Sequence, residues 1–238
     1  MFFRYDFHNH SCLSPCGDND MTPCNIVGMA KILNLDIIAL TDHNSCLNCP
    51  AAVKLGENSG VTVIPGMELC TAEEIHVVCL LPNTQKALDF SAYVRERIPP
   101  VKNREEIFGE QLILSEDDEI IGKEDLLLTT ASSIGIYEVP SLIKSFGGAA
   151  FPAHINRSSY SVISSLGEIT ADMGFSCAEL THDANLKEYT ERFPDLSGMK
   201  IFYNSDAHYL ENMNLDPKHI ELEEPTTEAV IEYINSPR

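Results

Sequence analysis

Short apolar runs alternate along the chain with longer segments in which apolar residues recur every three or four positions. The short runs predict strands, because buried strands of a parallel sheet read as continuous apolar stretches. The longer segments predict helices. The helix expected over 22–35 has Thr22 as a cap and Pro23 in its first turn. The expected strands are 3–8, 36–43, 61–68, 74–81, 148–155, 175–182, 200–208 and 219–222, and the expected helices are 22–35, 48–60, 137–146, 161–173, 185–193 and 226–234.

Strands that alternate with helices predict a parallel α/β arrangement. Seven or eight such units in 238 residues favour a barrel over an open sheet. The segment 84–136 interrupts this alternation, because it reads as a long polar helix over about 86–107 and then an acidic-tipped hairpin over 111–122. We interpret 84–136 as an insertion on one barrel domain that spans residues 1–238.

The chain carries 36 acidic and 16 basic residues, which gives a formal net charge of −20. A surface this negative repels polyanions, so the composition predicts that duplex nucleic acid is not a partner. No apolar run approaches the roughly 18–20 residues that span a bilayer, so no membrane association is expected. The opening residues, MFFRYDF, lack the apolar core of a signal peptide, which predicts a cytoplasmic protein.

Histidines and carboxylates gather at or near the ends of the expected strands. In a barrel of parallel strands these ends meet at one mouth. Alternate residues of a strand share a face, so His8 and His10 can bind one ion together. Buried imidazoles and carboxylates are costly unless a divalent metal pairs with them. The pattern predicts two or three divalent ions, with Glu68 shared, among His8, His10, His43, Glu68, His76, His154, Asp206 and His208.

Six segments resemble, in order, the motifs of the PHP (polymerase and histidinol phosphatase) family of metal-dependent phosphoesterases: FHNHS, LTDHN, PGMEL, EIHVVCLL, PAHI and SDAH. The segment between the first two motifs also resembles the family, with Asp18 at the acidic position before MTP. This resemblance implies a distorted, TIM-barrel-like (β/α)7 barrel with two or three zinc, manganese or iron ions at its mouth. It implies a first ion on His8, His10, Glu68 and Asp206, a second on Glu68, His76 and His154, and a third on Asp18, His43 and His208.

Such a site predicts a hydrolase in which a metal-bound hydroxide attacks a phosphate mono- or diester. The expected substrate is a small phosphorylated molecule or nucleotide. The alternatives are a nuclease-like activity that trims 3′ ends and a non-catalytic metal-binding module with a regulatory role.

Four further side chains are candidates near the mouth. Arg157 is either a phosphate clamp or a surface ion pair. His182 is either a proton donor to the leaving group or a rim histidine. Asp6 and Asp42 are expected to orient neighbouring imidazoles.

The eight cysteines suggest a second kind of site. Cys46 and Cys49 form a CxxC pair, and Cys16 and Cys24 lie upstream. Four such thiols either hold structural zinc or an iron–sulfur cluster or remain free. The cysteines in or beside the strand patterns are expected to be small core residues, namely Cys70, Cys79 and Cys177.

Overall fold

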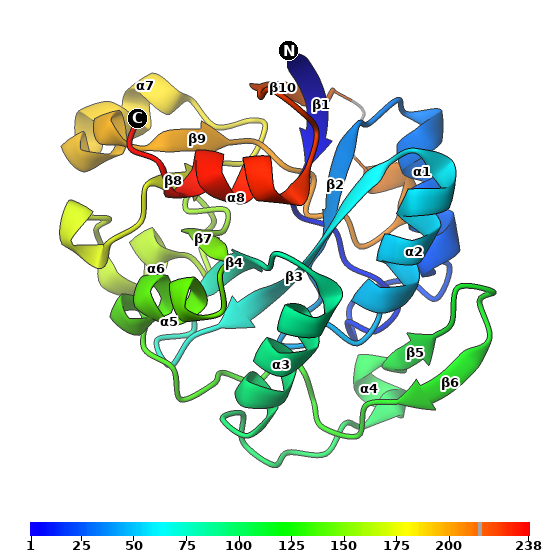
Figure 1. The fold of residues 1–238 in the computed structure, drawn as a ribbon. Helices are drawn as coiled ribbons and strands as arrows, with labels where there is room; N and C mark the ends of the chain where they lie inside the picture. Colours follow the sequence, from blue (N-terminus) through cyan, green and yellow to red (C-terminus); the bar gives the residue numbers. More distant parts are fainter. Residues whose placement is uncertain (214–215) are drawn as a thin grey trace.

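The structure is a computed structural model that describes residues 1–213 and 216–238 (Figure 1). Within these residues a six-stranded sheet has the order β10-β1-β2-β3-β4-β7, and β5–β6 and β8–β9 form two further pairs. The strands are β1 (Phe2–Asp6), β2 (Ile37–Leu40), β3 (Thr62–Cys70), β4 (His76–Leu80), β5 (Leu112–Leu114), β6 (Ile120–Lys123), β7 (Ala149–Pro152), β8 (Cys177–Glu179), β9 (Lys200–Phe202) and β10 (Lys218–Glu221).

The large sheet curls until its two ends approach each other. Strand β8 lies beside β7, where the amide of Ile155 donates to the carbonyl of Glu179 at 2.9 Å, and β8 pairs in parallel with β9. Beyond β9 the chain returns to the end of β1 through a parallel bridge between Ala207 and Asn9. The predicted α/β, TIM-barrel-like fold is therefore confirmed.

The barrel departs from seven regular β/α units. Strands β1, β2 and β3 are parallel, but β4 runs antiparallel to β3 and to β7. Only the short segment 71–75 joins β3 to β4, so no helix separates them. The last strand, β10, runs antiparallel to β1. A turn this short can only join antiparallel neighbours, which explains the departure from a strictly parallel pattern.

Most helices lie where the periodic segments predicted them, with ends set by local chemistry. The prediction of one helix over 161–173 is wrong, because an α-helix over Val162–Leu166 is capped by Gly167 and only a 3-10 turn follows at Ala171–Met173. Thr22 caps α1 by accepting a hydrogen bond from the amide of Asn25 at 3.2 Å, as Thr226 does for α8. No helix in the described part of the chain is long and apolar enough to cross a membrane. The α-helices are α1 (Pro23–Ile32), α2 (Cys49–Ser59), α3 (Thr84–Arg95), α4 (Glu105–Phe108), α5 (Val139–Ser145), α6 (Val162–Leu166), α7 (Leu186–Arg192) and α8 (Thr227–Asn235).

The segment 84–136 holds a shorter helix than predicted. Helix α3 ends at Arg95, and Pro99 and Pro100 follow in an irregular stretch, because proline cannot continue the hydrogen bonding of a helix interior. The predicted hairpin is present as β5 and β6. The interpretation of 84–136 as an insertion on a single domain remains a prediction.

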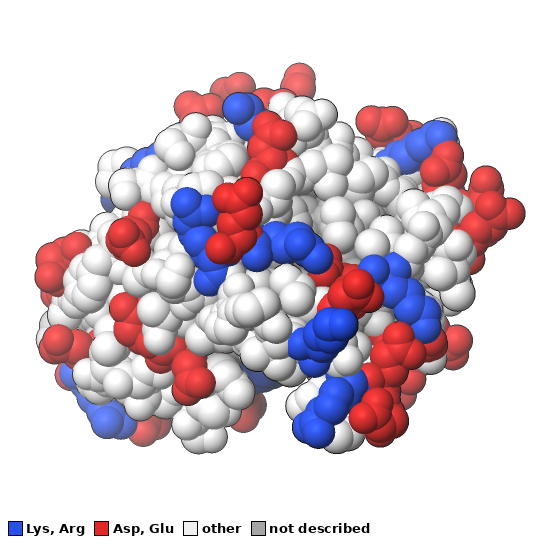
Figure 2. Space-filling model, turned by 90° about the horizontal axis from the view of Figure 1, so that it is seen from below, with Lys and Arg blue, Asp and Glu red and all other residues white. Residues whose placement is uncertain are grey.

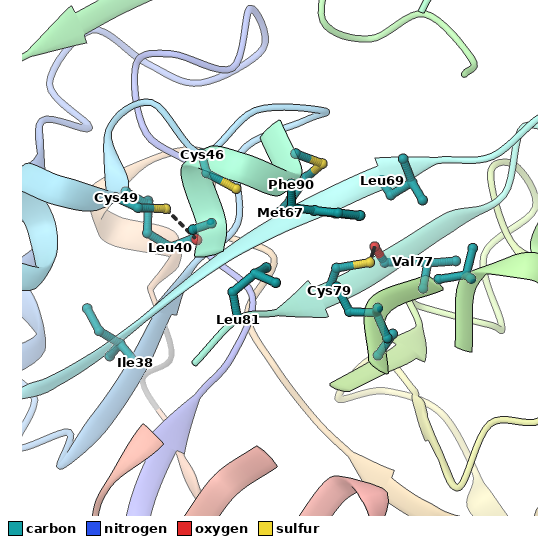
Figure 3. Close-up of a cluster of buried hydrophobic side chains, with 14 of the residues drawn as sticks. Ile38, Leu40, Cys46, Cys49, Met67, Leu69, Val77, Cys79, Leu81 and Phe90 are labelled. Atoms are coloured by element: carbon teal, nitrogen blue, oxygen red, sulfur yellow. Dashed lines mark hydrogen bonds between the residues drawn. The ribbon is translucent and has the colours of Figure 1, made fainter. Parts of the chain in front are cut away.

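Alternate residues of the strands in the large sheet pack into two separate cores. Ile38 and Leu40 of β2 face the layer formed by α1, α2 and α3, together with Met67 and Cys79 (Figure 3). Their neighbours face the inside of the curled sheet, where α8 covers them. This inner core includes Tyr5, Phe7, Ile37, Ala39, Ile64, Val78, Leu80, Phe151, Phe202, Val230 and Ile234.

Asp6 ties the end of β1 to the chain that follows β9. Its fully buried carboxylate accepts hydrogen bonds from the amide of Ser205 at 3.1 Å and from the Ser205 hydroxyl at 2.6 Å. Burial raises the pKa of Asp6 to about 6, although the hydrogen bonds from Ser205 oppose this rise. The predicted role for Asp6 was to orient an imidazole. It instead closes the barrel next to Asp206.

We expect Asp6 to make stability depend on pH. The folded protein holds this proton more tightly than an unfolded chain, in which the pKa of Asp is near 4. Its contribution is therefore complete below about pH 4 and is lost as the pH rises through about 6. Relative to Asp6→Asn, the wild type should lose up to about 3 kcal/mol of unfolding free energy between pH 4 and 7. Urea denaturation of metal-free protein measures this.

The exposed Asp36→Asn variant is the control and should follow the wild type across the same range. Parallel pH profiles for the wild type and Asp6→Asn would contradict the assignment.

Candidate metal centre

The carboxylate of Glu68 lies at the centre of a ring of imidazoles. It is 1% exposed, so the surrounding rings, and not water, compensate its charge. Each ring places a nitrogen within 3.4 Å of one of its two oxygens. The nitrogen–oxygen distances are 3.2 Å for His8, 3.4 Å for His10, 2.9 Å for His43, 2.9 Å for His76 and 3.2 Å for His154.

Strand periodicity explains how Glu68 and His76 come to face each other. Ile64, Gly66 and Glu68 are alternate residues of β3 and therefore share the inner face of the sheet. On the antiparallel strand β4, Val78 is the partner of Glu68, and His76 lies two residues further along the same face. The inner face is thus apolar in the depth of the barrel and becomes polar at its mouth.

A second group of candidate ligands joins the end of β1 to the chain after β9. The Nε2 atoms of His8 and His10 lie 3.3 and 3.1 Å from the same Asp206 oxygen. With Glu68 they form a set whose ligand atoms all lie within 4.8 Å of one another. The structure therefore brings together the four residues predicted to hold the first ion.

Glu179, which the sequence analysis missed, fixes the orientation of His8. Its carboxylate lies 3.0 Å from Nδ1 of His8, and it also accepts hydrogen bonds from the Asn204 amide and the backbone of His154. Such a contact leaves Nε2 of His8 free to bind an ion. The available signal was an acidic residue, Glu179, inside the otherwise largely apolar predicted strand 175–182.

Asp42 acts on His10 through a serine. The carboxylate accepts a hydrogen bond from the Ser14 hydroxyl at 2.7 Å, and that hydroxyl lies 3.0 Å from Nδ1 of His10. The same hydroxyl accepts a hydrogen bond from the backbone amide of His43 at 3.1 Å. This arrangement supports the prediction that Asp42 orients neighbouring imidazoles, with Ser14 as the intermediate.

Two of the candidate ligands have an uncommon backbone conformation. His154 has φ of 29° and Asp206 has φ of 51°, a region that residues other than glycine rarely adopt. Such strain persists only where surrounding contacts hold it, and it is concentrated at functional sites. In both cases the conformation turns the side chain toward Glu68 or the histidines around it.

The residues present fit a group of divalent cations. Nδ1 of His43 and Oε2 of Glu68 are buried and make no hydrogen bond, although they lie only 2.9 Å apart. Two buried polar atoms that are close but badly aligned for a hydrogen bond are suited to sharing a cation. His43, Glu68 and His76 form another set whose ligand atoms lie within 4.8 Å of one another.

The charge distribution also favours cations. Burial would raise the pKa of Glu68, but His76, His8 and His43 together hold it well below its usual range. Burial lowers the pKa of His10 well below its usual value, and the rings of His208 and His43 lower it further. Burial likewise lowers the pKa of His76. Burial would lower the pKa of His8 and His43 too, but the carboxylates around them hold both pKa values well above the usual value, so a bound cation would displace their protons.

The carboxylate of Asp18 is in none of the sets of candidate ligand atoms, among the described residues, that lie within 4.8 Å of one another, so its role as a ligand remains a prediction. This carboxylate accepts a hydrogen bond from the backbone of Asp20 at 2.9 Å. His10, His43 and His208 do cluster, with ligand nitrogens within 4.8 Å, and the side chain that approaches them is Cys16. The backbone amide of Asp18 donates to the carbonyl of His208 at 2.9 Å.

The four cysteines proposed for a cluster do not come together. Cys46 and Cys49 are buried among Leu40, Met67 and Phe90, and their thiols donate to backbone carbonyls (Figure 3). Cys16 and Cys24, by contrast, are exposed. The CxxC pair is therefore part of the outer core. The predicted small core residues Cys70, Cys79 and Cys177 are also buried.

A pocket of about 790 Å³ opens beside the carboxylate and histidine cluster. Arg157 and His182 both line it, as do Asp206 and His208. Arg157 donates to Asp206 at 2.6 Å, so it forms an ion pair with a candidate ligand, and its role as a phosphate clamp remains a prediction. His182 is near the rim, where burial and the charge of Lys218 lower its pKa.

A family model described as "PHP domain" matches residues 6–138. Over 81 residues the chain is 36% identical to the 5′-3′ exoribonuclease Rnm of Salmonella typhimurium (strain LT2), a match that covers 32% of this chain and 27% of that protein.

Two solved structures share the fold. One is the lesion-specific endonuclease PfuEndoQ from Pyrococcus furiosus, with a TM-score of 0.67, 17% identity, and coverage of 99% of this chain and 56% of that chain. The other is endonuclease Q in complex with a 27-mer duplex that carries an abasic lesion at the active site. It has a TM-score of 0.67, 16% identity, and coverage of 98% and 56%. This chain thus spans about half the length of those proteins.

These comparisons contradict our prediction of a small phosphorylated partner and no duplex nucleic acid. In endonuclease Q the same fold accepts a duplex, and the sequence relative is an exoribonuclease. The prediction failed because net charge sums the whole surface, whereas a substrate responds to the local field. Figure 2 shows Lys and Arg side chains interspersed with Asp and Glu on one face, and the pocket is lined by Arg157 and Lys218 together with Asp206, Glu211 and Asp216.

Replacing Glu68 should disrupt the whole centre. We expect Glu68→Gln to lose at least about one equivalent of bound metal per chain, because the Glu68 carboxylate lies within 3.4 Å of five histidine rings. Elemental analysis of the purified protein measures this.

His219→Ala, at an exposed position of β10, is the matched control and should retain the full metal content. Equal metal in Glu68→Gln and the control would refute the central role of Glu68.

Proposed function

The chain belongs to the PHP domain family of metal-dependent hydrolases, whose model matches more than half of its residues, and from this we propose that it hydrolyses phosphodiester bonds of nucleic acid strands. The observation that carries the proposal is the Glu68-centred cluster, which opens directly onto a pocket lined by Arg157. The nuclease relatives support the choice of substrate.

The side chains around Glu68 divide naturally into two ion positions. His8, His10, Glu68 and Asp206 would hold one divalent ion. A second ion would lie among Glu68, His43, His76 and His154, because each of these three rings has a nitrogen within 3.2 Å of a Glu68 oxygen. Divalent ions held there would lower the pKa of water and withdraw charge from a phosphoryl oxygen. Glu179 and the Asp42–Ser14 pair would keep the rings aligned during the reaction.

Arg157 is placed to hold the phosphodiester. One of its nitrogens donates to Asp206, and the guanidinium has further donors that suit two phosphate oxygens. A pocket of about 790 Å³ is of the size that encloses a nucleotide-sized group. We assign Arg157 the role of orienting the phosphorus for in-line attack and neutralising its equatorial oxygens.

His182 is our candidate for proton delivery to the leaving oxygen. It lines the same pocket as Arg157, and burial together with the charge of Lys218 lowers its pKa, so the protonated fraction of the ring increases as the pH falls. Because a proton donor acts in its protonated form, we expect activity to rise as the pH falls toward the pKa of His182.

The substrate class can be tested with end-labelled single-stranded RNA, single-stranded DNA and duplex DNA in the presence of Mn²⁺. We expect cleavage of at least one of these by the wild type and none by Glu68→Gln. Ladders of single-nucleotide steps would indicate action from an end, whereas internal fragments would indicate an endonuclease. Hydrolysis of p-nitrophenyl phosphate without cleavage of any oligonucleotide would overturn the proposal.

Arg157→Ala should lower kcat/KM on the cleaved oligonucleotide by about 10²- to 10³-fold, as expected for loss of one preorganised charge at the reacting group. Arg157→Lys should recover only part of this, because an ammonium cannot bind two oxygens in a fixed fork.

Arg192→Ala, on α7, is the control and should leave the rate unchanged. Metal content must stay constant in all three variants, since Arg157 contacts Asp206. A normal rate in Arg157→Ala would contradict the clamp.

A further inference from the structure

A row of aromatic rings crosses the centre and ends in an exposed tyrosine. Neighbouring ring centroids lie between 4.2 and 5.0 Å apart in the order His208, His10, His43, His76 and Tyr160. His208 stands at the end of the row that lines the pocket, whereas Tyr160 is not among the residues that line it. Tyr160 therefore marks the end of the row that lies away from the pocket.

The ring of Tyr160 is stacked on the imidazole of His76. The two centroids are 4.7 Å apart and the ring planes differ by 22°. His76 in turn lies 2.9 Å from a Glu68 oxygen, so only one ring separates Tyr160 from the shared carboxylate. The tyrosine is nevertheless 47% exposed, which leaves part of its aromatic surface open at the edge of the centre.

The backbone holds Tyr160 in this position. Its φ is 54°, a region that residues other than glycine rarely adopt, and its carbonyl accepts a hydrogen bond from the amide of His76 at 3.0 Å. The hydroxyl of Ser161 donates to the carbonyl of Arg157 at 2.7 Å. Strain of this kind persists only where such contacts hold it. One tied turn thus carries both Tyr160 and the arginine to which we assign the phosphate.

We propose that Tyr160 stacks on the base of a nucleotide next to the phosphate that Arg157 holds. Aromatic side chains beside a phosphate-binding groove bind single strands in this way, and any base suffices because every base has a π face. The contact favours a phosphate that carries a nucleoside on this side over a simple phosphate ester. This inference rests on the proposed function and names a contact by which the site selects nucleic acid.

The test uses the absence of tryptophan from the chain. Tyr160→Trp gives a protein with a single indole at the proposed contact. The probe is a single-stranded hexamer of thymidine, or of uridine if the wild type cleaves RNA alone, with phosphorothioate linkages that resist hydrolysis. Added to the Zn²⁺-loaded full chain, it should quench the indole fluorescence in a saturable way, because a base stacks on the ring. A hexamer of the same backbone without bases should not quench it.

Phe2→Trp is the matched control. It places the single indole at an exposed position at the start of β1, whereas His8 follows the other end of that strand. Neither hexamer should cause saturable quenching of this indole.

Binding of labelled hexamers, measured by fluorescence anisotropy, separates stacking from a merely structural role. Tyr160→Ala should weaken binding of the base-containing hexamer at least about fivefold and leave the base-free hexamer unchanged. Tyr160→Phe should bind both as the wild type does, because the ring and not the hydroxyl makes the contact. A tyrosine that only covered His76 would instead change both hexamers equally or lower the metal content.

No quenching in Tyr160→Trp, or equal weakening of both hexamers in Tyr160→Ala, would overturn the inference even if the wild type cleaves oligonucleotides. Failure of the wild type to bind either hexamer would overturn the proposed function and the stacking contact together. The two failures are therefore distinguishable. Circular dichroism and elemental analysis establish that each variant is folded and holds its metal.

Discussion

The interaction on which the structure depends is the approach of many imidazoles to one buried carboxylate. Glu68 has no access to solvent that could stabilise its charge, and its oxygens are surrounded by histidines from four separate parts of the chain. A metal-free cluster of this kind leaves buried polar atoms without partners, as at His43. The site is therefore built for cations, and the protein needs a rigid frame to hold its components together.

That frame is the curled sheet with its aromatic interior. Tyr5 and Phe7 stack at 4.6 Å between ring centroids, and Phe202 packs edge-on against Phe7 at 5.4 Å, which joins the two ends of the curl. Asp6 then binds Ser205 across the same junction. The polar ligands thus sit on a packed apolar layer, so small movements of the mouth are resisted by the core beneath it.

The local arrangement of charged groups also explains why the net charge gave a wrong prediction of the binding partners. A net charge of −20 describes the whole surface, but many acidic groups are directed inward at the centre or paired with lysines, as Glu105 and Glu110 are with Lys123. The pocket itself is lined by the cations Arg157 and Lys218 and by the carboxylates Asp206, Glu211 and Asp216, so its charge is mixed and not uniformly negative. Bound cations would add further positive charge at the place where a phosphate enters.

The sequence alone determined the α/β class, most elements and the candidate ligands on strands, because alternation and strand ends are local patterns. It could not show that β4 reverses or that Pro99 and Pro100 shorten the predicted helix. Nor could it show whether Asp18 or Cys16, two residues apart in one turn, has its side chain beside His43 and His208. Only the tertiary structure decided which side chain faces His208, and it alone revealed Glu179 behind His8. The physical reason is that packing, and not residue type, sets the direction in which a side chain points from a turn and the contacts between distant strands.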